Sequence, residues 1–139
     1  MKKIILLLAI LFLQISCNSD NETKRKDTGI VGTWKFTEAY IGDGGTNTKW
    51  NPVENGYTYT FKSDGTFTST RFTECTSGTY ILTTSILTLN FGCPGFTTAI
   101  ETPKGKFVEK YKSENGKMIL SPTYLICYEG CEYKFSKIK

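Results

Sequence analysis

Residues 57–72 read YTYTFKSDGTFTSTRF, and this stretch predicts two β-strands joined by a tight turn. Aromatic residues alternate with threonine over Tyr57–Phe61, which is typical of a strand that buries only one of its faces. The Ser-Asp-Gly sequence at 63–65 is a turn signal, because glycine tolerates positive φ and aspartate caps the bend. The partner strand is therefore expected over Thr66–Phe72.

The same period of two continues through the rest of the chain, which shows no convincing amphipathic helical pattern. Many short antiparallel strands with turn signals between them predict a barrel or a sandwich. A closed barrel is favoured because it removes both exposed sheet edges. We therefore expect an all-β fold, a small antiparallel up-and-down β-barrel of about eight strands. The further strands are expected over Thr33–Ile41, Gly78–Leu82, Ile86–Phe91, Lys106–Lys112, Lys117–Leu120, Tyr124–Cys127 and Cys131–Ile138. Asn115-Gly116, between the fourth and fifth of these, is the strongest short hairpin signal in the chain.

Strand parity assigns many of the aromatic residues to one interior. These rings either fill a packed core or line a calyx for a small apolar or aromatic ligand, with tyrosine hydroxyls at its mouth. Glu38 is the one acid that this parity places near the interior. The inward set is Trp34, Phe36, Tyr40, Tyr57, Tyr59, Phe61, Phe67, Tyr80, Leu82, Leu87, Leu89 and Phe91, and the candidate ligand-binding residues are Trp34, Phe36, Tyr57, Tyr59, Phe61 and Tyr80.

Four of the five cysteines lie within the strand-rich region and predict two disulfides. If the hairpin turns at Thr84, Cys75 and Cys93 face each other, and Cys127 faces Cys131 across a second tight turn. The alternative is that these two pairs are exchanged, which would join the two hairpins. Zinc and redox sites are disfavoured, because the spacing lacks C-x-x-C and the chain has no histidine, so we expect no metal and no cofactor.

The first residues have the organisation of an export signal. Two lysines precede the apolar run Ile4–Leu13, which is only half of the roughly 20 residues that a membrane-spanning helix needs. Ser16 directly before Cys17 resembles the lipobox of bacterial lipoproteins, in which the cysteine is acylated and begins the mature chain. The resemblance implies a signal peptide over 1–16 and a lipidated Cys17, attached for example through palmitate.

Residues 18–28 contain no apolar side chain, so 17–28 is expected to be the lipidated cysteine with a flexible tether, and 29–139 the folded domain. The lipobox implies an outer-membrane protein anchored in the bilayer through Cys17 and facing either the periplasm or the cell surface.

Charge and composition exclude several classes of function. The absence of histidine removes Ser-His-Asp and Cys-His catalysis. The glutamates, Glu109 among them, are scattered, mostly at strand ends or on polar faces, and form no convergent pair, so no catalytic residues and no enzyme are expected. The net charge of +4 is modest and forms no dense basic stripe, which argues against nucleic acid as a partner. The domain is expected to be a monomer.

Gly32, Thr33 and Trp34 form a G-x-W motif at the start of the first expected strand, as in lipocalins. With the F-x-x-D-G-T-F sequence of residues 61–67 and the G-T-Y sequence of residues 78–80, the chain resembles the lipocalin-like domain lipoproteins of Bacteroidetes. The resemblance implies a barrel that carries a small apolar ligand in the cell envelope. One departure is that no arginine follows Arg71, so the arginine that stacks on the motif tryptophan in lipocalins has no equivalent.

The alternative function is a surface protein–protein interaction or enzyme-inhibitor module with a fully packed barrel. The S-G-T-Y sequence at 77–80 is similar to an element of small lipoprotein lysozyme inhibitors. Two loops are candidate rim segments. Trp50, in the glycine-rich loop 42–52, is expected to fold onto the barrel end as a plug, or otherwise to act as a ligand lid or partner contact. The second segment, residues 93–96, is expected to present Phe96 on a strained turn.

Overall fold

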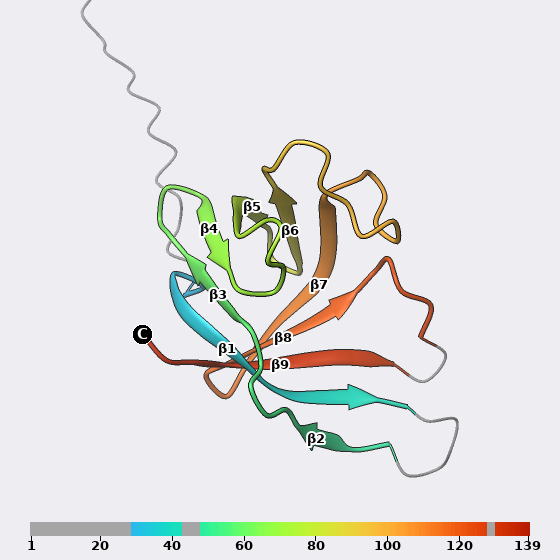
Figure 1. Ribbon diagram of the computed structural model, residues 1–139. Helices are drawn as coiled ribbons and strands as arrows, with labels where there is room; N and C mark the ends of the chain where they lie inside the picture. Colours follow the sequence, from blue (N-terminus) through green and yellow to red (C-terminus); the bar gives the residue numbers. More distant parts are fainter. Residues whose placement is uncertain (1–28, 43–47, 128–129) are drawn as a thin grey trace, which may run out of the picture.

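The computed structural model describes residues 29–42, 48–127 and 130–139, which form a closed β-barrel (Figure 1). Each strand pairs antiparallel with its neighbour, and β9 returns to pair with β1. Eight strands, β1 and β3 to β9, close the barrel, and β2 is an extra strand beside the second half of β1. The strands are β1 Gly32–Ile41, β2 Trp50–Pro52, β3 Thr58–Phe61, β4 Thr66–Ser69, β5 Ser77–Leu82, β6 Ile86–Phe91, β7 Lys106–Glu114, β8 Lys117–Pro122 and β9 Cys131–Lys137.

The predicted all-β barrel is therefore confirmed, with two local differences. The expected strand over Tyr124–Cys127 is wrong, because this segment is a loop between β8 and β9. Conversely, β2 was not predicted, since its three residues are too few to show an alternating pattern. The proposed signal peptide, Cys17 and tether lie outside the described residues. The described residues between 29 and 139 form one closed barrel with its own core, as is typical of a domain that folds by itself.

Turn chemistry fixes the register of the hairpins. Asp64 Oδ1 accepts hydrogen bonds from the backbone N–H of Thr66 at 2.8 Å and from its hydroxyl at 2.6 Å, which closes the turn between β3 and β4. Asn115 and Gly116 both have positive φ, as a two-residue hairpin turn requires, and they join β7 to β8. These local signals explain why most strands pair with their sequence neighbours.

A β-bulge in β1 changes which side chains point inward. The register shifts between Phe36 and Glu38, leaving Thr37 as the extra residue, and the Thr37 hydroxyl donates to the carbonyl of Lys134 at 3.2 Å. One extra residue reverses the parity of everything after it. Ala39 is consequently buried, and Tyr40 lies on the outer face, where its ring is 5.5 Å from Trp50.

The bulge makes three sequence-based expectations wrong. Tyr40 does not point into the barrel. Glu38 also lies on the outer face, where it accepts a hydrogen bond from Lys134 Nζ at 2.9 Å. Trp50 is neither a plug nor a lid, because it packs beside Tyr40 on the outer face with Lys134 Nζ 3.8 Å from its ring centroid. The alternation of side chains in the sequence does not reveal that Thr37 is an extra residue, so the bulge could not be predicted from it.

Trp34 of the G-x-W motif lies at the end of the barrel where the chain enters β1. Its side chain is buried, and the indole N–H donates to the carbonyl of Ile30 at 2.6 Å. Lys137 Nζ, from β9, lies 5.5 Å from the Trp34 ring centroid. This lysine therefore provides a cation beside the motif tryptophan, in place of the arginine that the chain lacks there. Gly32 has a φ of 129°, and a Cβ there would collide with the carbonyl oxygen of Lys139. The motif glycine is therefore required by the close approach of the C-terminal residues.

Two disulfides join Cys75 to Cys93 and Cys127 to Cys131, which is the predicted pairing. The register behind that prediction is displaced by one residue, because Tyr80 pairs with Leu89 in the β5–β6 hairpin. Cys75 and Cys93 lie beyond the ends of these strands, where the chain can absorb the displacement and bring the two Cα atoms to 5.7 Å.

The rings of the inward set confirm the interior assignment apart from Tyr40. The expectation that a rim segment presents Phe96 is wrong, because Phe96 packs against the core. Its ring folds back and lies 5.1 Å from Phe72 and 5.3 Å from Phe91. The segment that leads to Phe96 thus covers this side of the core.

Candidate functional site

An arginine and a glutamate lie inside the barrel among tyrosines. Arg71 follows β4 and continues its inward alternation after the buried Phe67 and Ser69, and its own N–H donates to Ser69 Oγ at 3.0 Å. Glu109 lies in β7, on the same face as the buried Phe107, and is only 1% exposed. The local parity of both strands therefore turns these two charged side chains toward the core.

Tyr124 reaches the same place from the loop after β8. Thr123 holds this loop against β7, because its N–H and its hydroxyl both donate to the carbonyl of Val108, at 3.0 and 2.8 Å. The following residue is thereby placed beside Glu109, and the Tyr124 hydroxyl donates to Glu109 Oε1 at 2.6 Å. The segment expected as a strand is thus a loop that delivers a side chain to the interior.

The Arg71 guanidinium connects these groups. It donates from Nη1 to the Tyr59 hydroxyl at 3.2 Å and from Nη2 to the Tyr124 hydroxyl at 3.3 Å, and Nη1 lies 3.8 Å from Glu109 Oε1. Its remaining N–H groups have no acceptor among the residues that the structure describes. The guanidinium carbon also lies over three rings, 4.9 Å from Phe72, 5.2 Å from Phe107 and 5.5 Å from Tyr57. We call Tyr57, Tyr59, Arg71, Glu109 and Tyr124 the Arg71 cluster.

Glu109 is incompletely satisfied in this cluster. Its Oε2 atom is buried and has no hydrogen-bond partner among the described residues. Burial raises the pKa of Glu109 to about 7, although the Tyr124 hydroxyl and the Arg71 charge both lower it. Desolvation outweighs these two favourable interactions because the carboxylate loses nearly all contact with water. Glu109 is therefore near the midpoint of its titration at neutral pH.

The tyrosines around Glu109 stay neutral. Burial raises the pKa of Tyr57, Tyr59, Tyr124 and Tyr133 above the usual value of 10. Arg71 stays charged, because a guanidinium is effectively always protonated in proteins. The charge inside the barrel is thus set by the proton on Glu109.

One side of the Arg71 cluster reaches solvent. The Arg71 side chain keeps 16% of its exposure, whereas that of Glu109 keeps 2%. Tyr57 of the cluster and two neighbouring inward-facing rings, those of Phe36 and Tyr133, are only half-buried. The Phe36 ring lies 5.2 Å from Tyr57 and 5.3 Å from Tyr133, so the three form one aromatic wall. An aromatic wall beside convergent polar groups is the usual make-up of a small-molecule pocket.

The six candidate ligand-binding residues divide into two groups. Tyr57 and Tyr59 belong to the Arg71 cluster, and the half-buried Phe36 ring lies 5.2 Å from Tyr57. The other three, Trp34, Phe61 and Tyr80, are buried in the core; the Phe61 and Tyr80 rings are 4.9 Å apart, and the Tyr80 hydroxyl donates to the carbonyl of Lys62 at 2.8 Å. The structure thus places only the first group next to interior polar atoms.

Sequence reasoning missed Arg71, Glu109 and Tyr124. The expectation that Glu109 lies on a polar face or strand end is wrong. A signal was present, because Glu109 occupies an inward position between Phe107 and Tyr111. Arg71 likewise continues the parity of Phe67. A charged residue in an apolar alternation is a sign of a functional interior.

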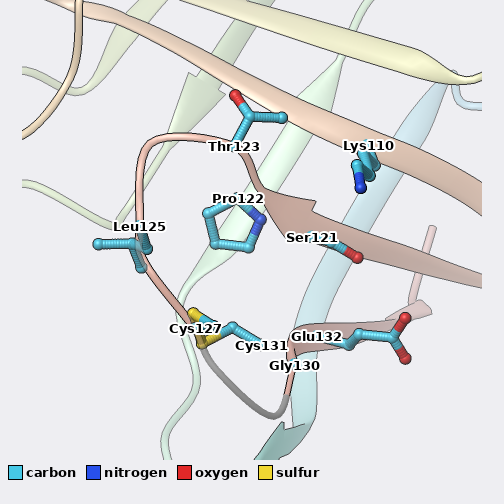
Figure 2. Close-up of a pocket in the computed structure, with 9 residues that line it drawn as sticks. All are labelled: Lys110, Ser121, Pro122, Thr123, Leu125, Cys127, Gly130, Cys131 and Glu132. Carbon is cyan, nitrogen blue, oxygen red and sulfur yellow. A yellow bond between two sulfur atoms is a disulfide. The ribbon is translucent and has the colours of Figure 1, made fainter.

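A separate hollow of about 460 Å³ lies at the surface between β7, the end of β8 and the start of β9. Figure 2 shows Leu125 and the Cys127–Cys131 disulfide along the loop that borders it, with Lys110 and Glu132 on neighbouring strands. Its charged groups are exposed or half-buried. No side chain in it is a buried polar group without a partner among the described residues, so it is a weaker candidate than the Arg71 cluster.

The described part of the chain contains no group of three or more metal-ligating His, Cys, Asp or Glu residues. It also contains no helix long and apolar enough to cross a membrane.

Comparison with known proteins identifies the class. Residues 30–120 match the family model of the lipocalin-like domain, and the chain belongs to this family. A lipocalin-like protein from Bacteroides uniformis is 17% identical with a TM-score of 0.52, and the match covers 78% of this chain and 98% of that one. An uncharacterized protein from Bacteroides eggerthii is 21% identical with a TM-score of 0.50, covering 77% and 98%. No curated protein matches the chain.

Proposed function

We propose that this protein binds a small, mainly apolar or aromatic molecule inside its barrel, next to the Arg71 cluster. The observation that carries the proposal is the composition of the interior. A barrel built only for stability would be filled by apolar side chains, because each unpaired buried polar atom costs free energy. Here the interior holds Arg71 and the unpartnered Glu109 Oε2 beside half-buried rings.

The test is a titration of the barrel, residues 29–139, with the neutral apolar dye Nile red, whose fluorescence rises in an apolar site. Saturable binding at one site per chain is expected. Tyr133→Trp adds volume to the inward-facing wall and should weaken binding several-fold. Tyr40→Trp makes the same chemical change on the outer face and should leave binding unchanged.

Two results would overturn this proposal. Absence of saturable binding by the folded barrel would favour the alternative, a protein–protein interaction or inhibitor module with a packed interior. Equal weakening by both tryptophan variants would place the dye away from the aromatic wall.

We also propose that the mature chain is a lipoprotein of the cell envelope, anchored in the outer membrane through acylated Cys17. The support is the lipobox-like Ser16-Cys17 after a short apolar run, followed by eleven residues without an apolar side chain. Labelled palmitate should be incorporated into the full chain and lost in Cys17→Ser. A matched Cys75→Ser variant should keep the label, and label retained in Cys17→Ser would exclude this anchor.

A further inference from the structure

We infer that the Arg71 cluster binds the carboxylate end of an amphipathic ligand, and that Glu109 takes up a proton from solvent as the ligand enters. This inference rests on the proposed function and specifies the chemistry of its ligand. Three features of the cluster support it, namely the guanidinium, the orphaned glutamate oxygen and the aromatic wall.

The guanidinium provides the positive charge and the geometry. Its donors to Tyr59 and Tyr124 use one N–H on each Nη, and the other N–H groups have no acceptor in the described residues. Planar guanidinium donors match the two oxygens of a carboxylate better than a lysine ammonium does. Glu109 does not occupy these donors, because its nearer oxygen is 3.8 Å from Nη1.

Glu109 provides a second donor when it is protonated. Oε1 accepts the hydrogen bond from Tyr124, so the proton belongs on Oε2, which has no partner within the described residues. A ligand carboxylate beside Arg71 would accept this hydrogen bond with one oxygen and those of the guanidinium with the other. An ionised Glu109 would instead repel the same carboxylate, so one proton must be bound for each anion that enters.

Within residues 29–42, 48–127 and 130–139, no other group near Glu109 competes for this proton. Arg71 approaches Glu109 from the segment after β4, and Tyr124 approaches it from the loop after β8. Tyr57 lies just before β3, Tyr59 lies in β3 and Tyr133 lies in β9, and each of them interacts electrostatically with Glu109. Its cross-strand neighbours in β6 and β8 are Leu87 and Pro122, which do not titrate. Burial raises the pKa of all four tyrosines, so each stays neutral in the range where Glu109 titrates.

The aromatic wall of Phe36, Tyr57 and Tyr133 is the place for the apolar part of the ligand. These rings are half-buried, and Tyr57 connects them to the guanidinium, because the Arg71 Cζ atom lies 5.5 Å from the Tyr57 ring centroid. The charged end is therefore expected to lie deep in the barrel and the apolar part along the rings. The fit is to an aliphatic or aromatic monocarboxylate, which is the ligand class that we assign.

The first test compares decanoate with decanol, which share a ten-carbon chain and differ in the carboxylate. Both are used to displace Nile red from the barrel, residues 29–139, at pH 6. We expect decanoate to displace the dye at a concentration at least tenfold lower. Arg71→Gln should abolish this preference, whereas Lys110→Gln, which removes one positive charge from the exposed face of β7, should preserve it.

The second test measures the proton. The apparent dissociation constant of decanoate should change little between pH 5.5 and pH 6 and rise about fivefold between pH 7 and pH 8, while that of decanol does not change. Calorimetry at pH 7.5 in two buffers of different ionisation enthalpy should show uptake of about three quarters of a proton per decanoate. Glu109→Gln, which keeps a donor at this position, should bind decanoate without pH dependence.

The outcomes separate the two proposals. If Nile red binds but decanoate and decanol displace it equally, or if no proton is taken up by the wild-type barrel, the carboxylate inference is wrong and the proposed function stands. If neither the dye nor decanoate binds, the proposed function is wrong as well. The displacement and proton-uptake measurements on the wild-type barrel need no variant. Both proposals can therefore still be refuted if Arg71→Gln or Glu109→Gln folds poorly.

Discussion

Replacing Glu109 with glutamine should change how the stability of the barrel depends on pH. In the folded protein, burial raises the pKa of Glu109 to about 7 from its ordinary value of 4.5. Below pH 4.5 the carboxyl is protonated in both the folded and unfolded states, and its contribution to stability is complete. Between pH 4.5 and pH 7 only the folded state keeps the proton, so the free energy of unfolding falls as pH rises, and above pH 7 this contribution is lost.

The magnitude follows from the two pKa values. A difference of 2.5 pKa units corresponds to about 3 kcal/mol of unfolding free energy, and Glu109 is too buried for solvent to screen it. Glutamine cannot ionise, so Glu109→Gln escapes this loss. The variant should therefore gain about 3 kcal/mol relative to wild type between pH 4.5 and pH 8.

Urea unfolding followed by tryptophan fluorescence measures this difference at a series of pH values. Subtracting wild type from variant at each pH cancels the contributions of all other carboxyl groups. Glu54→Gln, an exposed position, serves as the matched control and should change the free energy of unfolding little. A difference between Glu109→Gln and wild type that does not vary with pH would refute the claim that Glu109 is buried with a raised pKa.

Three further predictions concern the frame of the barrel, each measured by urea unfolding. Gly32→Ala should cost about 1–3 kcal/mol, because its φ of 129° disfavours a side chain and a Cβ would meet the C-terminal backbone; an unchanged midpoint would contradict this. Replacing both Cys75 and Cys93 with serine should cost about 3 kcal/mol, from the loop of 18 residues that the disulfide closes, and no change under matched reducing conditions would argue against this account. Glu101→Gln should cost about 1–3 kcal/mol at pH 7, whereas exposed Glu74→Gln should be neutral, because the buried Glu101 carboxylate accepts hydrogen bonds from two backbone N–H groups and a threonine hydroxyl. These bonds hold the pKa of Glu101 well below its usual range, so its contribution is present above pH 4.5, and the difference between wild type and Glu101→Gln should shrink as pH falls below that value.

Local patterns were sufficient for most of the architecture. The alternation in residues 57–72, the turn at 63–65 and the Asn115-Gly116 hairpin predict strands and turns that the structure confirms. Such features depend on residues close together in the chain, so they can be read without knowledge of distant contacts. The disulfide pairing could be predicted for the same reason, since both bridges close short hairpin-like segments.

The candidate site depended on contacts across the barrel. Arg71, Glu109 and Tyr124 come from three separate segments, and only closure of the sheet brings Arg71 of the β4 side within hydrogen-bonding distance of Tyr124. The raised pKa of Glu109 also arises from burial by the whole barrel, which no sequence window contains. The sequence pattern therefore placed most of the glutamates at strand ends or on polar faces and gave Arg71 no role in the site.

By itself, the amino-acid sequence determined that the chain forms short antiparallel strands with defined turns, because these structures follow from alternation and local turn chemistry. The tertiary structure decided which way the side chains of β1 point, since the bulge at Thr37 depends on pairing with β9, which lies at the opposite end of the domain sequence. It also decided that a charged arginine and a protonatable glutamate share the interior, because their energies are set by neighbours that only the closed barrel brings together.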